Sequence, residues 1–230
     1  MKGSEKNVTI ETVLFDFDGT LADSNELINQ SHLSVLEEYF PGEYTLDSVR
    51  QFNGPSLETT YQFLGAEKSE EMITKYREYN AVYHNQMIRL FKGVEENLKL
   101  LKQKGVRLGI VSTKRNDVLE KGIRHLNLEG LFEVVIGAED YTHFKPYPEP
   151  IYAAMAKLNC QHSTTIMVGD NGHDILAAKN AGIMSVFVGW SQKTSEEIAP
   201  FKPDLTVQTM DELAAFVLKN EVSRLDKGRD

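Results

Sequence analysis

The sequence predicts an α/β protein with a parallel sheet, helices on both faces of that sheet, and an inserted segment that is entirely helical. From residue 93 onward, short apolar runs alternate with amphipathic helical patterns, and parallel strands need such crossover helices. Between residues 23 and 89 the pattern is helical only. We therefore expect a core formed by residues 1–22 and 90–230, and a cap domain formed by residues 23–89.

The core elements follow from apolar runs and helical periodicity. The stretch TVLFDF from Thr12 reads as a buried first strand. Further strands are expected at residues 106–112, 133–140, 165–170, 184–190 and 204–207. Helices are expected at residues 93–105, 118–128, 148–159, 174–182 and 209–220. In the first of them Val94, Leu98 and Leu101 share one helical face, which should cover the sheet.

The inserted segment holds three helical patterns. The first covers residues 24–40 and begins at Ser24, a residue type that caps helix N-termini. The others cover residues 56–65 and 69–87. No strong strand pattern interrupts them, so an all-helical cap is expected.

Charge and cysteine content restrict the partners and the compartment. With 34 acidic and 25 basic residues the formal net charge is −9, which argues against nucleic acid and anionic membranes as partners. A pocket for a small phosphorylated substrate remains compatible with it. The single cysteine, Cys160, excludes an internal disulfide and fits the cytoplasm. The polar N-terminus predicts no signal peptide, and no apolar run reaches the roughly 18 residues of a membrane span.

Polar residues that suit phosphoryl chemistry follow predicted strands. They are Asp16 and Asp18 after the first strand, then Ser112, Lys145 and Asp170. Carboxyl ends of parallel strands meet at one sheet edge, so these side chains should converge. Three carboxylates suit Mg²⁺, while a hydroxyl, an ammonium and the backbone N–H groups of residues 17–20 suit a phosphoryl group. The sequence therefore predicts phosphoryl transfer, with one carboxylate attacking phosphorus.

Four motifs in order resemble those of the haloacid dehalogenase superfamily. They are DFDGTL from Asp16, IVSTK from Ile110, KPYPEP from Lys145 and VGDNGHD from Val168. The resemblance covers nearly the whole chain and implies a Rossmann-like core with a C1-type helical cap, as in the phosphoglycolate phosphatase-like branch. It also implies a Mg²⁺-dependent phosphatase.

The resemblance assigns a role to each motif residue. Asp16 would be the nucleophile that forms an aspartyl-phosphate, and Asp18 the general acid and then the base. Ser112 and Lys145 would bind the phosphoryl group. The expected metal ligands are Asp16, the backbone carbonyl of Asp18 and Asp170, with support from Asn171 and Asp174. Further expected substrate contacts are Gly19, Thr20, Thr113 and Lys114.

The cap stretch FPGEYTLDSVRQFNGPSLETT resembles that of bacillary pyrophosphatases of this superfamily. The resemblance implies that a cap loop faces the core site and contributes to substrate choice; its residues are Asn53, Gly54, Pro55 and Ser56. Two positions depart from the family pattern: Tyr147 stands where many relatives have Asp, and Thr113 where Asn is common.

Several functions stay open at this stage. Inorganic pyrophosphate is the first expected substrate, and phosphoglycolate or another small phosphomonoester the second. A third possibility is a β-phosphoglucomutase-like phosphomutase, which would share Asp16 and Asp18 but retain its aspartyl-phosphate. A fourth is a non-catalytic phosphate-binding regulatory protein, which would keep only the fold. The six histidines, His84 and His173 among them, show no chelating spacing and are expected in structural or surface roles. The sequence indicates no oligomeric state.

Overall fold

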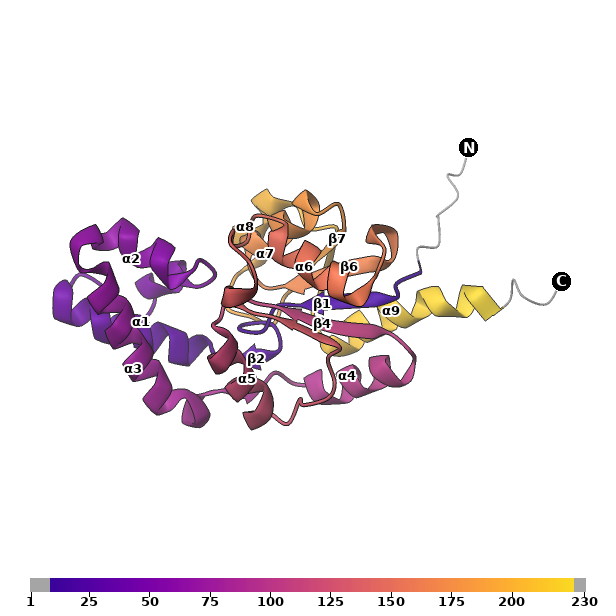
Figure 1. The fold of residues 1–230 in the computed structure, drawn as a ribbon, viewed down its shortest axis with the longest axis horizontal. Helices are drawn as coiled ribbons and strands as arrows, with labels where there is room; N and C mark the ends of the chain where they lie inside the picture. The colour runs from indigo at the N-terminus through magenta and orange to yellow at the C-terminus, as the bar shows by residue number, and fades with distance from the viewer. Residues whose placement is uncertain (1–8, 226–230) are drawn as a thin grey trace.

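The computed structural model describes residues 9–225 and contains a six-stranded sheet (Figure 1). In spatial order its strands are β5 (Val134–Ile136), β4 (Arg107–Val111), β1 (Thr12–Phe15), β6 (Thr165–Gly169), β7 (Met184–Val188) and β8 (Leu205–Val207). Every neighbouring pair is parallel. The predicted fold class is therefore confirmed, and β1 lies between β4 and β6, where Phe15 pairs with Ile110 and Val168.

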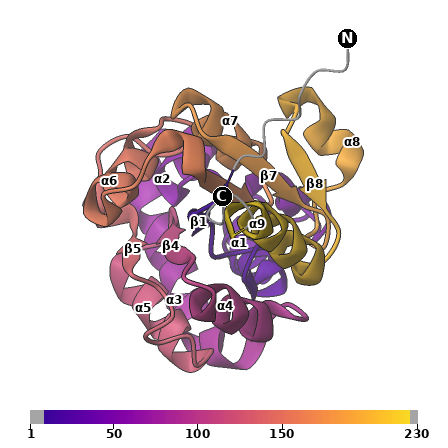
Figure 2. The same cartoon turned by 90° about the vertical axis from the view of Figure 1, so that its right-hand side faces the viewer.

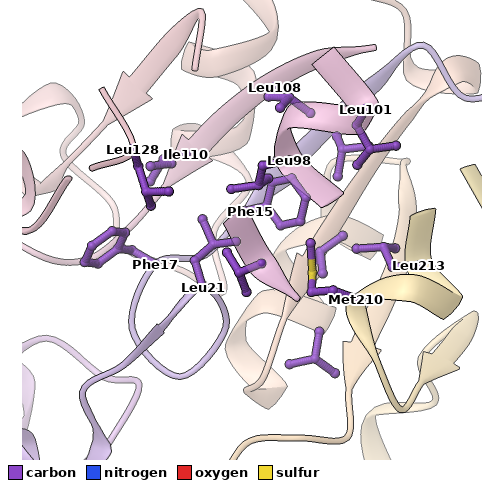
Figure 3. Close-up of a cluster of buried hydrophobic side chains, with 14 of the residues drawn as sticks. Phe15, Phe17, Leu21, Leu98, Leu101, Leu108, Ile110, Leu128, Met210 and Leu213 are labelled. Carbon is purple, nitrogen blue, oxygen red and sulfur yellow. The ribbon is translucent and has the colours of Figure 1, made fainter. Parts of the chain in front are cut away.

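Helices cover both faces of the sheet. Successive side chains of a strand point to opposite faces, so a strand that is apolar throughout has side chains to bury on each face. Val13 and Phe15 of β1 belong to a buried cluster with one group of helices, whereas Leu14 belongs to a cluster on the other face. The first group is α4 (Val94–Gln103), α5 (Asn116–His125) and α9 (Met210–Leu225), and the second is α6 (Glu149–Leu158) and α7 (Gly172–Asn180). Figure 2 shows the two groups from the end of the molecule, and Figure 3 shows Phe15 within the first cluster.

One core strand is clearly shorter than predicted, and one core helix was not predicted at all. The strand expected at residues 133–140 ends at Ile136 and is followed by a 3-10 turn, Ala138–Asp140. The Asp140 carboxylate accepts the Gly137 N–H at 2.9 Å, which turns the chain out of the sheet. A short helix that the sequence did not predict, α8 (Ser195–Ile198), follows β7.

The inserted segment folds as α1 (Asn25–Tyr39), α2 (Leu57–Gly65) and α3 (Ser69–Met87), with 3-10 turns at Ser48–Phe52 and Ala66–Lys68. Figure 1 shows these helices together at one side of the sheet. They share a buried cluster of their own, which includes Leu36, Tyr61 and Met72. The predicted domain boundaries at 22/23 and 89/90 stay a prediction.

Two short strands that the sequence did not predict join the insert to the core. β2 (Ala22–Asp23) pairs antiparallel with β3 (Arg89–Leu90) at the two ends of the insert. Strands of two residues are too short to show a periodic pattern, so the sequence could not reveal them.

No helix within residues 9–225 is both long and apolar enough to cross a membrane. The N-terminal residues 1–8, for which the sequence predicts no signal peptide, lie outside the described part of the chain.

Candidate active site

Most of the predicted functional residues line one cavity of about 630 Å³ between the sheet edge and the inserted helices, whereas Gly19, Thr20, Lys145 and Asp174 do not. Its core wall includes Asp16, Asp18, Ser112, Thr113, Lys114, Asp170 and Asn171. Its cap wall includes Asn53, Gly54, Pro55, Ser56, Arg77 and His84. A cavity of this volume suits a small-molecule ligand.

Three carboxylates meet at the core side of the cavity, and two of them, Asp16 and Asp170, line it. Oxygen atoms of Asp16, Asp170 and Asp174 lie within 4.8 Å of one another, a spacing at which they could hold one metal ion. Burial raises the pKa of Asp16 well above its usual value, although Lys145 opposes the rise. Burial, with the Asp174 carboxylate adding to it, raises the pKa of Asp170 to about 7. A cation in this cluster would offset the repulsion among the ionised carboxylates.

Lys145 lies buried between two of these carboxylates. Its Nζ donates to Asp174 Oδ1 at 2.5 Å and to the Val111 carbonyl at 3.1 Å, and it lies 3.1 Å from Asp16 Oδ1. Burial lowers the pKa of Lys145, but the carboxylates of Asp16 and Asp174 more than offset this and raise it. The side chain therefore stays cationic next to Asp16.

Asp18 is held apart from the carboxylate cluster by partners of its own. Its Oδ1 accepts the Ser24 hydroxyl at 2.6 Å, and Lys114 Nζ lies 2.8 Å from Oδ1 and 2.9 Å from Oδ2. Lys114 was expected to contact the substrate, and in the structure its ammonium is paired with Asp18. Ser24 was expected to cap α1, but its hydroxyl makes no cap bond because it donates to Asp18 instead.

Two substrate contacts predicted after β1 have structural partners instead. The Gly19 N–H was expected to face an anion, but it donates to the Ala22 carbonyl at 2.8 Å. Gly19 has φ +76°, and a Cβ there would lie 2.3 Å from Asp170 Oδ2, so the position needs glycine. The Thr20 hydroxyl is buried and donates to Asp170 Oδ1 at 3.4 Å. Both residues therefore shape the surroundings of Asp170.

The cap loop reaches the core through Asn171. Asn171 Nδ2 donates to the Asn53 carbonyl at 2.8 Å, while its Oδ1 accepts the His173 N–H and caps α7. A Cβ on Gly54 would lie 2.4 Å from Asn171 Nδ2, so loop and core are in close contact. The Asn171 amide thus joins the cap loop to α7, and its expected support of the metal stays a prediction. The Ser56 hydroxyl accepts the Thr59 N–H at 3.2 Å inside the cap, although Ser56 also lines the cavity.

Residues after β4 complete the core wall. The buried Ser112 hydroxyl accepts the Lys114 N–H at 3.2 Å, and its carbonyl accepts the Tyr141 hydroxyl at 2.8 Å. Thr113 lines the cavity beside them. Tyr147, one of the two departures from the family pattern, is 59% exposed and does not belong to this wall.

Sequence reasoning missed Ser191, which follows β7. Its hydroxyl donates to Asp170 Oδ2 at 2.7 Å and accepts from Asn25 Nδ2 of α1 at 3.3 Å, so it connects the carboxylate cluster to the cap. The neighbouring Trp190 Nε1 donates to the Thr20 carbonyl at 3.0 Å. Its position could have indicated a functional residue, because Ser191 follows the carboxyl end of a parallel strand, as the predicted site residues do.

Comparisons with known proteins agree with this geometry. The family model described as haloacid dehalogenase-like hydrolase matches residues 13–188. A pyrophosphatase PpaX from Anoxybacillus flavithermus is 39% identical over 210 residues, covering 91% of this chain and 98% of that protein. A PpaX from Bacillus mycoides is 41% identical over 204 residues, covering 89% and 95%. The crystal structure of a predicted phosphatase from Clostridium acetobutylicum superposes with a TM-score of 0.83 at 27% identity, covering 92% of this chain and 99% of that one.

Proposed function

Because the chain belongs to the haloacid dehalogenase-like hydrolase family, we propose that it hydrolyses inorganic pyrophosphate with Mg²⁺ through an aspartyl-phosphate on Asp16. The observation that carries the proposal is the arrangement around Asp16. Its carboxylate lines the cavity, contacts the buried ammonium of Lys145, and shares a cluster with Asp170 and Asp174. The pyrophosphate assignment is supported by the PpaX relatives, which match over nearly their whole length.

The first half-reaction uses Asp16 and Asp18. An Asp16 carboxylate oxygen attacks one phosphorus atom, and the bond from that phosphorus to the bridging oxygen breaks. The electron pair stays on the bridging oxygen, which takes a proton from Asp18 and leaves within orthophosphate. Asp18 is held for this transfer by Ser24 and Lys114. Lys145 neutralises negative charge on the attacking carboxylate and the transferred group.

The second half-reaction restores the enzyme. Asp18, now a carboxylate, accepts a proton from water as the water oxygen attacks the phosphorus of the aspartyl-phosphate. The bond between that phosphorus and the Asp16 oxygen breaks, which releases the second orthophosphate and regenerates the carboxylate. The same residue thus serves first as acid and then as base.

The cation that best fits the cluster is Mg²⁺. Asp16, Asp170 and Asp174 offer only oxygen atoms, the ligand type that Mg²⁺ takes in proteins. Burial raises the pKa of Asp16 and of Asp170, and neighbouring carboxylates add to the rise, so a divalent cation would favour the ionised forms. When bound, Mg²⁺ would stabilise negative charge on the transferred phosphoryl oxygens. Within the described residues, Asp16 and Asp170 would bind Mg²⁺. Asp174 would orient the Lys145 ammonium beside this metal site.

A second candidate function is hydrolysis of a small phosphomonoester such as phosphoglycolate. The cavity volume of about 630 Å³ favours it, because a leaving group larger than orthophosphate would fit. The two candidates share the Asp16 chemistry and differ only in the leaving group. We also propose a cytoplasmic location, which the single cysteine supports.

The deciding experiment measures phosphate release with Mg²⁺ from pyrophosphate, phosphoglycolate and sugar phosphates, compared by kcat/KM. We expect the highest kcat/KM with pyrophosphate. A preference for phosphoglycolate would replace the first candidate by the second. No Mg²⁺-dependent release from any substrate would contradict both and leave a phosphomutase or a non-catalytic phosphate-binding protein, which a bisphosphate-dependent isomerisation assay would separate.

A further inference from the structure

The cap wall of the cavity carries one side chain with a permanent positive charge. The ionisable cap residues that line the cavity are Glu58, Arg77, Tyr76 and two histidines, His32 and His84. Burial lowers the pKa of His32 to about 3 and also lowers that of His84, so both rings are neutral near pH 7. A guanidinium stays protonated in proteins. Among the described cap residues, Arg77 is therefore the only cation on the cavity wall.

Arg77 lies on the face of α3 that lines the cavity. Asn80, Ala81 and His84 follow it at three, four and seven positions, the spacing of one helical face, and all of them line the same cavity. The Arg77 side chain is 39% exposed, whereas the neighbouring His84 is fully buried. An anion that enters the cavity can therefore reach the Arg77 side chain.

This face of α3 lies within electrostatic reach of Asp18, which lines the cavity with it. Burial raises the pKa of Tyr76, and the Asp18 carboxylate is among the charges that add to the rise. Burial lowers the pKa of His84, and the same carboxylate opposes that shift. Asp18 thus acts on both ends of the α3 segment that contains Arg77. Because Asp18 is the proposed acid for the leaving group, that group would lie beside this segment.

The contacts of Arg77 leave donors available for a ligand. Its ion pair within the described residues joins one terminal nitrogen to Glu58 Oε1 at 3.0 Å. Glu58 lies in the first turn of α2, lines the same cavity, and has a side chain that is 46% exposed. A guanidinium has five N–H donors, and an ion pair that is open to solvent is weak. An anion in the cavity can therefore bind Arg77 beside Glu58.

We propose that Arg77 binds a second anionic group of the substrate, on the leaving side of the phosphoryl group that Asp16 attacks, an inference that deepens the proposed function and rests on it. In pyrophosphate this second group is the departing phosphate, and in phosphoglycolate it is the carboxylate. Both groups offer pairs of oxygen atoms that match the planar guanidinium.

This contact selects a class of substrate. Glu58 holds one edge of the Arg77 guanidinium, and the rest of it faces the substrate anion. A phosphomonoester whose leaving group is uncharged, such as a sugar phosphate, would leave Arg77 without a second anion to bind. The preferred substrates are therefore small molecules that carry an anionic group beside the phosphoryl group that is transferred.

The test compares Arg77→Gln with Arg124→Gln as a matched control. Arg124 lies on α5, outside the cavity wall, and also pairs with one glutamate, Glu120. In Arg77→Gln we expect kcat/KM for pyrophosphate to fall roughly tenfold or more, mainly through KM, because a charge-assisted hydrogen bond to the substrate is lost. For p-nitrophenyl phosphate, which carries no second anion, kcat/KM should stay within about twofold. Arg124→Gln should match the wild type with both substrates.

Glu58→Gln is a second test, with the opposite sign, and it applies even if Arg77→Gln does not fold. The amide keeps an acceptor for Arg77 but removes a negative charge from the cavity wall. We expect KM for pyrophosphate to fall about twofold, because less repulsion opposes the substrate anion. An ion pair that only stabilises the cap would instead make both substitutions harmful.

Three outcomes would overturn the Arg77 contact. They are equal losses with pyrophosphate and p-nitrophenyl phosphate in Arg77→Gln, unchanged kinetics in that variant, and a higher KM for pyrophosphate in Glu58→Gln. A wild type that hydrolyses phosphoglycolate but not pyrophosphate would replace the proposed substrate. In that case a selective loss of phosphoglycolate hydrolysis in Arg77→Gln would still support the contact, and its absence would overturn it.

Discussion

At the scale of residues, the acidic side chains divide into two groups with different partners. Asp16 and Asp174 contact the ammonium of Lys145, and Asp170 lies close to both carboxylates. Asp18 stands apart, paired with Lys114. Asp16 and Asp18 are two residues apart after β1 but contact different cations, Lys145 and Lys114. The proposed function uses the first group to hold a cation and Asp18 to transfer a proton.

The proposed nucleophile is tested by Asp16→Asn. The amide keeps the shape of the side chain and still leaves Asp174 beside Lys145, so the fold should persist. Turnover should fall by at least about a thousandfold, because an amide cannot form the aspartyl-phosphate. Phosphate release measured with saturating Mg²⁺ checks this, with Asp23→Asn, on an exposed residue, as the control. Turnover at the wild-type level in Asp16→Asn would exclude Asp16 as the nucleophile.

Ser191 provides a second test at this scale. Its hydroxyl donates to Asp170 Oδ2 at 2.7 Å and so orients a proposed metal ligand. In Ser191→Ala we expect the Mg²⁺ concentration for half-maximal activity to rise roughly tenfold, because partners that orient metal ligands contribute to metal affinity. The maximal rate at saturating Mg²⁺ should change little. Ser163→Ala, on the surface, is the matched control, and an unchanged Mg²⁺ dependence in Ser191→Ala would show that this bond is dispensable.

At the scale of elements, two loops bring the cap against the core. The cap loop after the 3-10 turn Ser48–Phe52 contacts Asn171, and the loop after β7 contacts the cap through several polar groups. Arg50 donates to the Gln192 carbonyl, Lys193 donates to the Arg50 carbonyl at 3.2 Å, and Asn29 donates to Gln192 Oε1 at 3.2 Å. These contacts hold the cap over the proposed site.

Gly54→Ala tests whether the close contact of the cap loop with Asn171 matters. Gly54 has φ +115°, and an added Cβ would lie 2.4 Å from Asn171 Nδ2, so the loop must move away from the core. We expect KM to rise about tenfold, because small displacements of positioning groups are costly. Gly42→Ala is the control for backbone strain alone, since Gly42 has φ +74° and no atom within 4 Å of its Cβ position. Equal effects in both variants would assign the loss to strain.

At the scale of the whole molecule, burial of the carboxylate cluster links stability to pH and to the cation. The folded-state pKa of Asp170 is raised from 3.8 to about 7, and that of Asp16 is also raised. The folded state therefore holds more protons than the unfolded state between these values. The contribution of the two groups to stability is present at low pH and is lost as pH rises toward about 7.

A divalent cation should reverse this loss. We expect the rise in Tm caused by Mg²⁺, relative to EDTA, to be larger at pH 8 than at pH 5.5, because protons compete with the cation at low pH. Taking the difference at each pH removes the effects of groups whose titration does not depend on Mg²⁺. Asp170→Asn should abolish most of the difference. A Mg²⁺ effect on Tm that is equal at both pH values would contradict a cation in this cluster.

Much of the fold could be predicted from the sequence, because the core elements are long enough to show their period. The apolar strand at β1 and the one-sided helix at α4 are examples, and both lie within a few residues of their expected bounds. The strand pair β2 and β3 and the short helix α8 were missed because two to four residues carry no period. The strand expected at residues 133–140 was too long, since the bond from Gly137 to Asp140 ends it.

The sequence by itself determined which residues stand at the carboxyl ends of the strands, because a parallel sheet brings those ends to one edge. Asp16, Ser112 and Asp170 reach the cavity for this reason. Only the tertiary structure decided the partners of each side chain. Ser24 bonds Asp18 instead of capping α1, and Asn171 at the N-terminus of α7 donates to the Asn53 carbonyl of the cap loop. Such contacts join residues that are far apart in the chain or that lie in irregular loops. Local periodicity in the sequence carries no information about contacts of this kind.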